Sequence, residues 1–133
     1  MSTRTKKIIG WVLTTVLALL LATSAADKII ASPHAAKTGA LLGLSVSTYR
    51  LLGIVELLSA LLFVFTRTGL LGTLLLASYL GGAIATHLLH QQDVAFPAVF
   101  EVVLWSAAAL RFPELTSRLF GRILQPGANK QTL

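Results

Sequence analysis

Four ionisable side chains lie inside long apolar runs of this sequence: Arg50, Glu56, His87 and Glu101. The phenol of Tyr79 has similar apolar neighbours along the chain. An ionisable group in an apolar environment is costly unless it is paired or hydrated, so each of these residues is a candidate functional residue. A carboxyl or imidazole group can exchange protons, and a phenol or guanidinium group can orient a bound molecule through hydrogen bonds.

The composition indicates that a lipid bilayer surrounds these residues. Of the 133 residues, 55% are hydrophobic and 12% are charged, and the mean hydropathy is +0.79. Soluble domains carry about 25% charged residues, and a short chain cannot bury this much apolar surface. We therefore expect a single transmembrane domain over residues 1–133. The net charge of +6 is spread between the apolar runs and the tails, so no nucleic-acid partner is indicated.

Four apolar runs predict four membrane-spanning helices, over residues 8–26, 49–65, 70–89 and 96–111. A helix of about 20 residues is roughly 30 Å long, which matches the hydrocarbon thickness of a bilayer. The short polar link at 66–69 forces its two helices into an antiparallel hairpin. The expected fold class is therefore all-α, an integral membrane four-helix bundle with up-down-up-down order. The first run also resembles a secretory signal peptide, but the residues after it do not resemble an exported soluble domain.

Two shorter helices are expected outside the spans. Ser32 followed by Pro33 is typical of a helix start, and it predicts a short outer-surface helix over 33–44. After Pro113, apolar and basic side chains alternate with helical spacing, which predicts an interfacial amphipathic helix over 113–124.

The distribution of Lys and Arg predicts the orientation of the chain. With four spans, eight of them fall on one side of the membrane: Arg4, Lys6, Lys7, Arg67, Arg111, Arg118, Arg122 and Lys130. Only Lys28, Lys37 and Arg50 fall on or near the other side. Basic residues are enriched in cytoplasmic segments, so both termini are expected to be cytoplasmic.

The third span carries a row of small residues at every fourth position. The predicted helix-packing residues are Gly69, Thr73, Ala77, Gly81 and Ala85, with Gly82 in a neighbouring row. Small residues let helix backbones approach closely in lipid, so we expect this row to pack against other helices. A separate bulky row is expected to face lipid, and it comprises Leu76, Leu80, Ile84 and Leu88.

Counting residues from the predicted turns gives each polar group a depth. Glu56 comes level with Tyr79 near the membrane midplane, and Arg50 comes close to His87 near the outer surface. Glu101 lies between these two levels and shares a helix face with Trp105. The sequence therefore predicts a polar pocket between the second, third and fourth spans, open to the non-cytoplasmic side. Its candidate ligand-binding residues are Arg50, Glu56, Tyr79, His87, Glu101 and Trp105, with Glu56 and His87 as candidates for proton exchange.

A purely structural role for these groups is the alternative. Arg50 can neutralise Glu101, and a protonated Glu56 can donate a hydrogen bond to Tyr79 and fix the helix register. His87 and His90 lack a full set of metal ligands at one level, so no metal site is assigned. The chain has no cysteine, which excludes disulfide and thiol redox chemistry.

A set of these residues resembles the DoxX-like family of small bacterial membrane proteins. The resemblance covers roughly residues 8–113 and rests most specifically on the run Tyr79 to His87. Its other matching positions are Glu56, Arg67, Gly72, Ala77, Ser78, Trp105, Arg111 and Pro113. The resemblance implies four transmembrane helices in the bacterial inner membrane. It places Glu56, Tyr79 and His87 among the characteristic positions, in a family associated with quinone-linked oxidation and with oxidative-stress complexes.

Two functions are consistent with these observations. The first is the binding of a small lipophilic ligand, such as a quinone, in the outer-half pocket as part of a redox-linked process. The alternative is a non-catalytic scaffold that packs against itself, as a homo-oligomer, or against a membrane enzyme. No haem, nucleotide or metal motif appears in the sequence, and the residues leave open whether the protein is an enzyme.

Overall fold

Serine residues begin the first three helices of the protein. The hydroxyls of Ser2, Ser32 and Ser45 each accept a hydrogen bond from the backbone N–H three residues further on. Such N-caps satisfy amide groups that have no partner within the helix. Proline also starts α2, because its fixed φ suits the first helical position.

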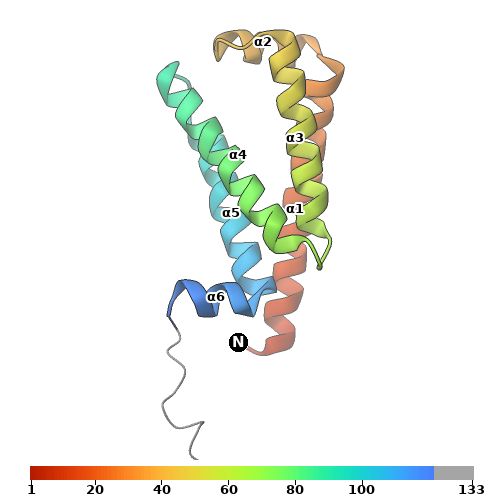
Figure 1. Ribbon diagram of the computed structural model, residues 1–133, viewed down its shortest axis with the longest axis vertical. Helices are drawn as coiled ribbons and strands as arrows, with labels where there is room; N and C mark the ends of the chain where they lie inside the picture. The colour runs from red at the N-terminus through yellow and green to blue at the C-terminus, as the bar shows by residue number, and fades with distance from the viewer. Residues whose placement is uncertain (122–133) are drawn as a thin grey trace, which may run out of the picture.

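The computed structural model describes residues 1–121, and this part of the chain is helical (Figure 1). The helices are α1 (Thr3–Ile30), α2 (Pro33–Leu41), α3 (Val46–Val64), α4 (Gly69–Leu89), α5 (Ala95–Arg111) and α6 (Pro113–Leu119). The predicted all-α fold is confirmed. The first helix is longer than the predicted span 8–26, because the charged residues on either side of that span continue the helix.

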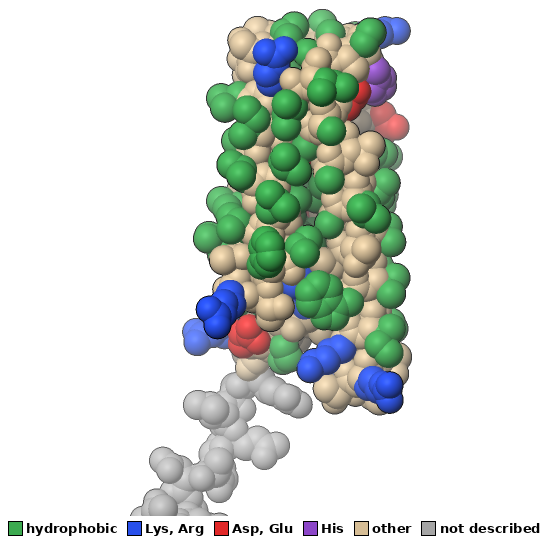
Figure 2. Space-filling view, turned by 90° about the vertical axis from the view of Figure 1, so that its right-hand side faces the viewer, with side chains coloured by type: hydrophobic (Ala, Val, Ile, Leu, Met, Phe, Trp, Pro, Cys, Tyr) green, Lys and Arg blue, Asp and Glu red, His purple; other side chains and the backbone are tan. Residues whose placement is uncertain are grey.

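Three of these helices, α1, α3 and α4, are long and apolar enough to cross a membrane. The fourth long helix, α5, has 17 residues, and α6 meets it at an angle of 108°. The bend falls at Phe112, which precedes Pro113 and has a non-helical backbone. Figure 2 shows a broad band of hydrophobic side chains along one face, with Lys and Arg gathered towards its ends. This distribution suits a lipid bilayer.

The long helices pack in a ring. The first helix contacts α3 and α5, and α4 contacts the same two helices from the other side. The short α2 contacts α1 and α3, while α6 contacts α5. In Figure 1, α4 and α5 diverge from α1 and α3 towards the end of the molecule where α2 lies.

The hydrophobic core fills the end where the helices stay close together. It contains Leu17, Leu21, Ala60, Phe63, Leu76, Leu80, Phe100, Leu104, Ala107, Ala108 and Phe112. Glycine permits the closest helix contact there: a Cβ on Gly72 would lie only 2.1 Å from the backbone N of Phe63. The hairpin between α3 and α4 is therefore held together by backbone-to-backbone packing.

The packing of α4 differs from the sequence prediction. Gly69 and Thr73 are buried as expected, but Gly81 and Gly82 are exposed, and a Cβ on either would meet no atom within 4 Å. Ala85 is also exposed. Conversely Leu76 and Leu80, expected to face lipid, belong to the core. A row at every fourth residue drifts by about 40° per step around a helix, so it cannot follow one contact face for five steps.

The amphipathic segment after Pro113 is shorter than predicted within the described residues. Helix α6 ends at Leu119, and Gly121 then adopts a positive φ of 53°. None of the residues in α6 is buried, as expected for a helix on the surface of the bundle. The remainder of the predicted 113–124 helix, from residue 122, lies outside the described residues, as do Arg122 and Lys130 of the orientation argument.

Candidate functional site

A cavity of about 790 Å³ lies between the diverging helices. All of the helices from α1 to α5 contribute side chains to its wall. Most of the wall is apolar, with leucines on α1, α3, α4 and the loop after α2, and with Phe96, Pro97 and Phe100 on α5. A volume of this size is typical of sites that hold small molecules.

A buried ion pair lies in the wall of this cavity. The ammonium of Lys28 lies 2.6 Å from Oε2 of Glu56 and also donates a hydrogen bond of 2.7 Å to Ser24 Oγ. The hydroxyl of Tyr79 donates to the same carboxylate oxygen over 3.2 Å. Only 2% of Glu56 is exposed. Three helices therefore converge on one carboxylate group: α1 through Lys28, α3 through Glu56 and α4 through Tyr79.

Local geometry explains why Lys28 reaches into the bundle. Side chains in a helix tilt towards its N-terminus, so the ammonium of Lys28 extends back over Ser24, away from α2. At this level α1 and α3 are very close, because a Cβ on Gly53 would lie 2.8 Å from the Cβ of Lys28. The close approach lets the Lys28 side chain reach Glu56, which lies one helical turn after Gly53.

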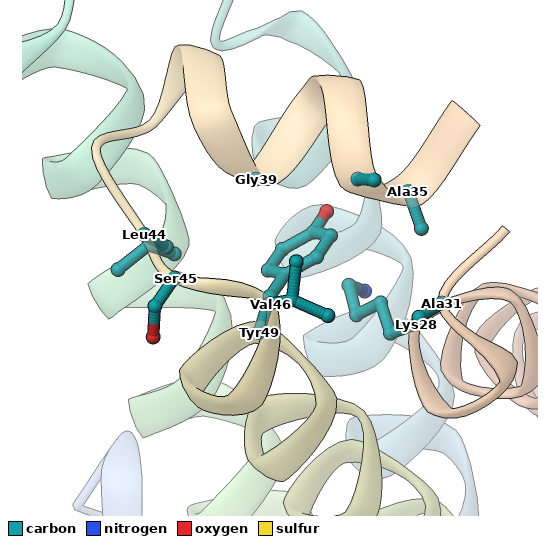
Figure 3. A pocket seen from close by; sticks show the side chains of 9 residues that line it. Lys28, Ala31, Ala35, Gly39, Leu44, Ser45, Val46 and Tyr49 are labelled. Carbon is teal, nitrogen blue, oxygen red and sulfur yellow. The ribbon is translucent and has the colours of Figure 1, made fainter. Parts of the chain in front are cut away.

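Aromatic rings complete the surroundings of the ammonium. Lys28 Nζ lies 5.5 Å from the ring centroid of Tyr49 and 5.8 Å from that of Tyr79. The Tyr49 ring rises from α3 towards Gly39 of α2, where a Cβ would lie 3.0 Å from it (Figure 3). A small second cavity of about 10 Å³ between these elements has room for about one water molecule.

Histidine lines the cavity towards the end of the molecule where α2 lies. His87 Nδ1 lies 2.7 Å from the carbonyl oxygen of Ala83. Because a carbonyl oxygen only accepts, this contact requires a proton on Nδ1. His34 of α2 also contributes to the wall, as does Asp27, which accepts a hydrogen bond from the Ser32 hydroxyl.

The small residues in the C-terminal half of α4 shape the cavity. Ser78, Gly82, Ala83 and Thr86 all line it, whereas Gly81 does not. The space beside Gly82 is open, since an added Cβ would meet nothing within 4 Å. Small side chains at these positions therefore leave room between helices rather than bringing helices together.

Three of the predicted site residues lie elsewhere. Arg50 is exposed and does not line the cavity, and no ion pair joins it to Glu101 within residues 1–121. Glu101 instead accepts a 2.7 Å hydrogen bond from Trp105 Nε1. The two residues belong to the same helix, and neither lines the cavity. The other carboxylate oxygen, Oε2 of Glu101, is buried without a hydrogen-bond partner in the described part of the chain.

Of the side chains that meet at the Glu56 carboxylate, Lys28 is the one that the sequence reasoning missed. Its charge, with that of Asp27, predicts the end of the first span and so places it at the outer boundary. The buried residues of α1 are Gly10, Thr14, Leu17, Leu21 and Ala25, at intervals of three or four. Position 28 continues this spacing, so the periodicity of the helix places Lys28 on its inner face.

The described residues hold no group of three or more His, Asp or Glu side chains with the geometry of a metal site. The polar groups of the cavity can instead form hydrogen bonds and exchange protons. The carboxylate of Glu56 contacts both Lys28 and Tyr79. His87 lies about two helical turns beyond Tyr79 on α4.

The fold and the cavity define a class: an all-helical protein, over the described residues, whose long apolar helices suit a lipid bilayer and diverge around an open cavity with a buried ion pair in its wall. The chain belongs to the DoxX-like family, because the model of that family matches residues 12–107. This range contains Lys28, Glu56, Tyr79 and His87. Neither the curated proteins nor the solved structures include a match to the chain.

Proposed function

We propose that this protein binds a small lipophilic molecule, such as a quinone, in the cavity between its helices as part of a redox-linked process. The observation that carries the proposal is an apolar cavity of about 790 Å³ with a buried ion pair in its wall. An apolar wall with a few converging polar groups is the usual form of a small-molecule site.

The polar groups suit a ligand that takes up or releases protons. Glu56 and His87 are the candidates for proton exchange, and the Tyr79 hydroxyl is placed to orient the polar end of a ligand. Quinones are lipophilic and gain protons when they are reduced, so they match both the apolar wall and these groups.

Two neighbouring glycines provide the test of this function. A Gly82→Leu variant places a side chain in the cavity, whereas Gly81→Leu places the same side chain outside it, and neither has an atom to clash with at Cβ. Native mass spectrometry of the gently purified protein should detect a bound small molecule in the wild type and in Gly81→Leu. The molecule should be lost from Gly82→Leu and from Glu56→Gln. Equal occupancy in all four proteins would remove the proposal.

A scaffold role is the second candidate, and the open surface at Gly81 favours it. The Cβ position of Gly81 is free of contacts, which leaves room for another helix to approach closely. If the protein packs against itself or a membrane enzyme through this surface, Gly81→Leu should dissociate the complex. Glu56→Gln would then act only through stability.

We place the protein in the bacterial inner membrane with both termini in the cytoplasm. Support comes from the family and from the charges at the two ends of the bundle. The end near the N-terminus carries Arg4, Lys6, Lys7, Arg67 and Arg118, whereas Lys37 and Arg50 lie at the other end and Lys28 is engaged by Glu56.

A further inference from the structure

The ion pair in the cavity wall has unused hydrogen-bonding capacity on both of its members. An ammonium group has three N–H donors, and Lys28 uses two of them, for Ser24 and for Glu56. Both hydrogen bonds to the Glu56 carboxylate reach Oε2. Within residues 1–121, Oε1 takes part in no hydrogen bond. A ligand in the cavity therefore meets one free donor and one free acceptor side by side.

The pair also sets the charge that a head group meets at this point of the wall, whereas the other carboxylate of the wall, Asp27, accepts a hydrogen bond from Ser32. Lys28 and Glu56 neutralise each other, and their side chains are only 11% and 3% exposed. An anionic head group near Lys28 would be repelled by Glu56, and a cationic head group near Glu56 would be repelled by Lys28. A charged head group would also leave one buried charge in excess beside the neutral pair.

We infer that the ligand has an uncharged polar head that both donates and accepts a hydrogen bond, as a hydroxyl group does, and that Lys28 and Glu56 bind this head together. The inference rests on the proposed function and narrows it to neutral hydroxyl-bearing lipophiles, including a quinol, as opposed to fatty-acid anions or amines. The head accepts from the free N–H of Lys28 and donates to Oε1 of Glu56. Its apolar body lies along the leucine and phenylalanine side chains of the cavity.

Three probes of equal chain length test the inference: 1-dodecanol, dodecanoate and dodecylammonium. Each is titrated into the full-length protein in lipid nanodiscs, and nanodiscs with Gly82→Leu are used to subtract partition into lipid. The wild type should bind 1-dodecanol about tenfold more tightly than either charged probe, because specificity here comes from repulsion of like charge. A wild-type preference for dodecanoate or dodecylammonium would overturn the inference.

Variants of the pair should change this preference in opposite directions. Glu56→Gln leaves Lys28 without its counter-charge, so the preferred probe should become dodecanoate. Lys28→Met leaves Glu56 alone, so binding should shift towards dodecylammonium. Lys37→Met, an exposed lysine outside the cavity, should keep the wild-type order. If the Glu56 and Lys28 variants also keep that order, the pair does not bind the head group and the inference is wrong.

Failure of the inference differs from failure of the proposed function. A wild type that binds a charged probe best, with binding still blocked by Gly82→Leu, contradicts only the neutral head group. If the wild type binds each probe no more tightly than Gly82→Leu, the cavity is not a ligand site. The proposed function and the inference then both fail. Thermal unfolding of each variant confirms that the folded protein is being compared.

Discussion

Lys28 and Glu56 join the last turn of α1 to the middle of α3 through a contact of 2.6 Å. The contact holds α1 and α3 together where they already approach closely at Gly53. The cavity lies between these two helices and the pair formed by α4 and α5. Tyr79 links the same carboxylate to α4. The pair thus both links two helices and forms one polar part of the cavity wall.

Removal of one member of this pair should destabilise the protein. Lys28→Met leaves the buried Glu56 carboxylate without its counter-charge, and we expect a loss of about 3 kcal/mol in the free energy of unfolding. The double variant Lys28→Met with Glu56→Met should recover most of this loss, because no buried charge then remains. Reversible unfolding of Lys28→Met, of Glu56→Met and of the double variant in mixed micelles measures the coupling, and Lys37→Met is the control. Strictly additive effects of the two substitutions would show that the pair contributes no coupling energy.

Two glycines of α4 should respond oppositely to the same substitution. Gly72→Ala places a Cβ 2.1 Å from the backbone N of Phe63, so α3 and α4 must move apart. We expect a loss of on the order of 2 kcal/mol in the free energy of unfolding. Gly81→Ala meets no atom within 4 Å and should stabilise the helix by up to about 1 kcal/mol. Similar thermal unfolding of the two variants would contradict the close approach at Gly72.

The sequence is sufficient to place Glu56 opposite Tyr79. Residue counting from the turn at 66–69 predicts that the two side chains lie at one level, and the structure joins them by a hydrogen bond. The prediction succeeds because a short link forces α3 and α4 into a hairpin, and a helix rises by a constant amount per residue. The same counting places Arg50 near His87, but it gives only height and not direction around the helix. Arg50 is exposed on the outside of α3.

The partner of Glu56 and the role of the small residues in α4 could not be predicted in the same way. Charged residues usually mark the end of a membrane span, so the sequence places Lys28 at the membrane boundary. The structure instead places it on the inner face of α1. Small residues in lipid are expected to bring helices together, as Gly72 does. The same residue type at Gly82 lines an open space instead, because α4 diverges from α3 beyond the core. Only the path of the whole helix distinguishes these two uses of glycine.

The proposed orientation predicts which end of the bundle reacts with reagents outside the cell. The chain has no cysteine, so single cysteines report one position each. A Lys37→Cys variant should react with a membrane-impermeant maleimide in intact bacterial cells, because α2 lies at the outer end. Arg67→Cys, in the exposed turn between α3 and α4, should react only after the membrane is permeabilised. The reverse pattern would invert the proposed topology.

Arg111 should be irreplaceable by lysine, although both side chains are positively charged. Its guanidinium group donates to the carbonyl oxygens of Phe63 and Val64, at 2.9 and 3.1 Å, and these are the last residues of α3. Helix ends leave such carbonyl groups without partners, so one planar group on α5 caps α3. A hydrogen bond of 3.2 Å to Thr14, and the ring of Trp11 at 4.2 Å, tie the same group to α1.

An Arg111→Lys variant keeps the charge, but its compact ammonium group cannot contact the carbonyl oxygens of Phe63 and Val64 and the ring of Trp11 at the same time. We expect a loss of about 2 kcal/mol in the free energy of unfolding, comparable to one charged hydrogen bond. Arg118→Lys, on the exposed surface of α6, should leave thermal unfolding unchanged. Because Arg111 does not line the cavity, the affinity for 1-dodecanol should stay at the wild-type value in the folded Arg111→Lys protein. Equal stability of the Arg111 and Arg118 variants would show that the guanidinium group does not cap α3.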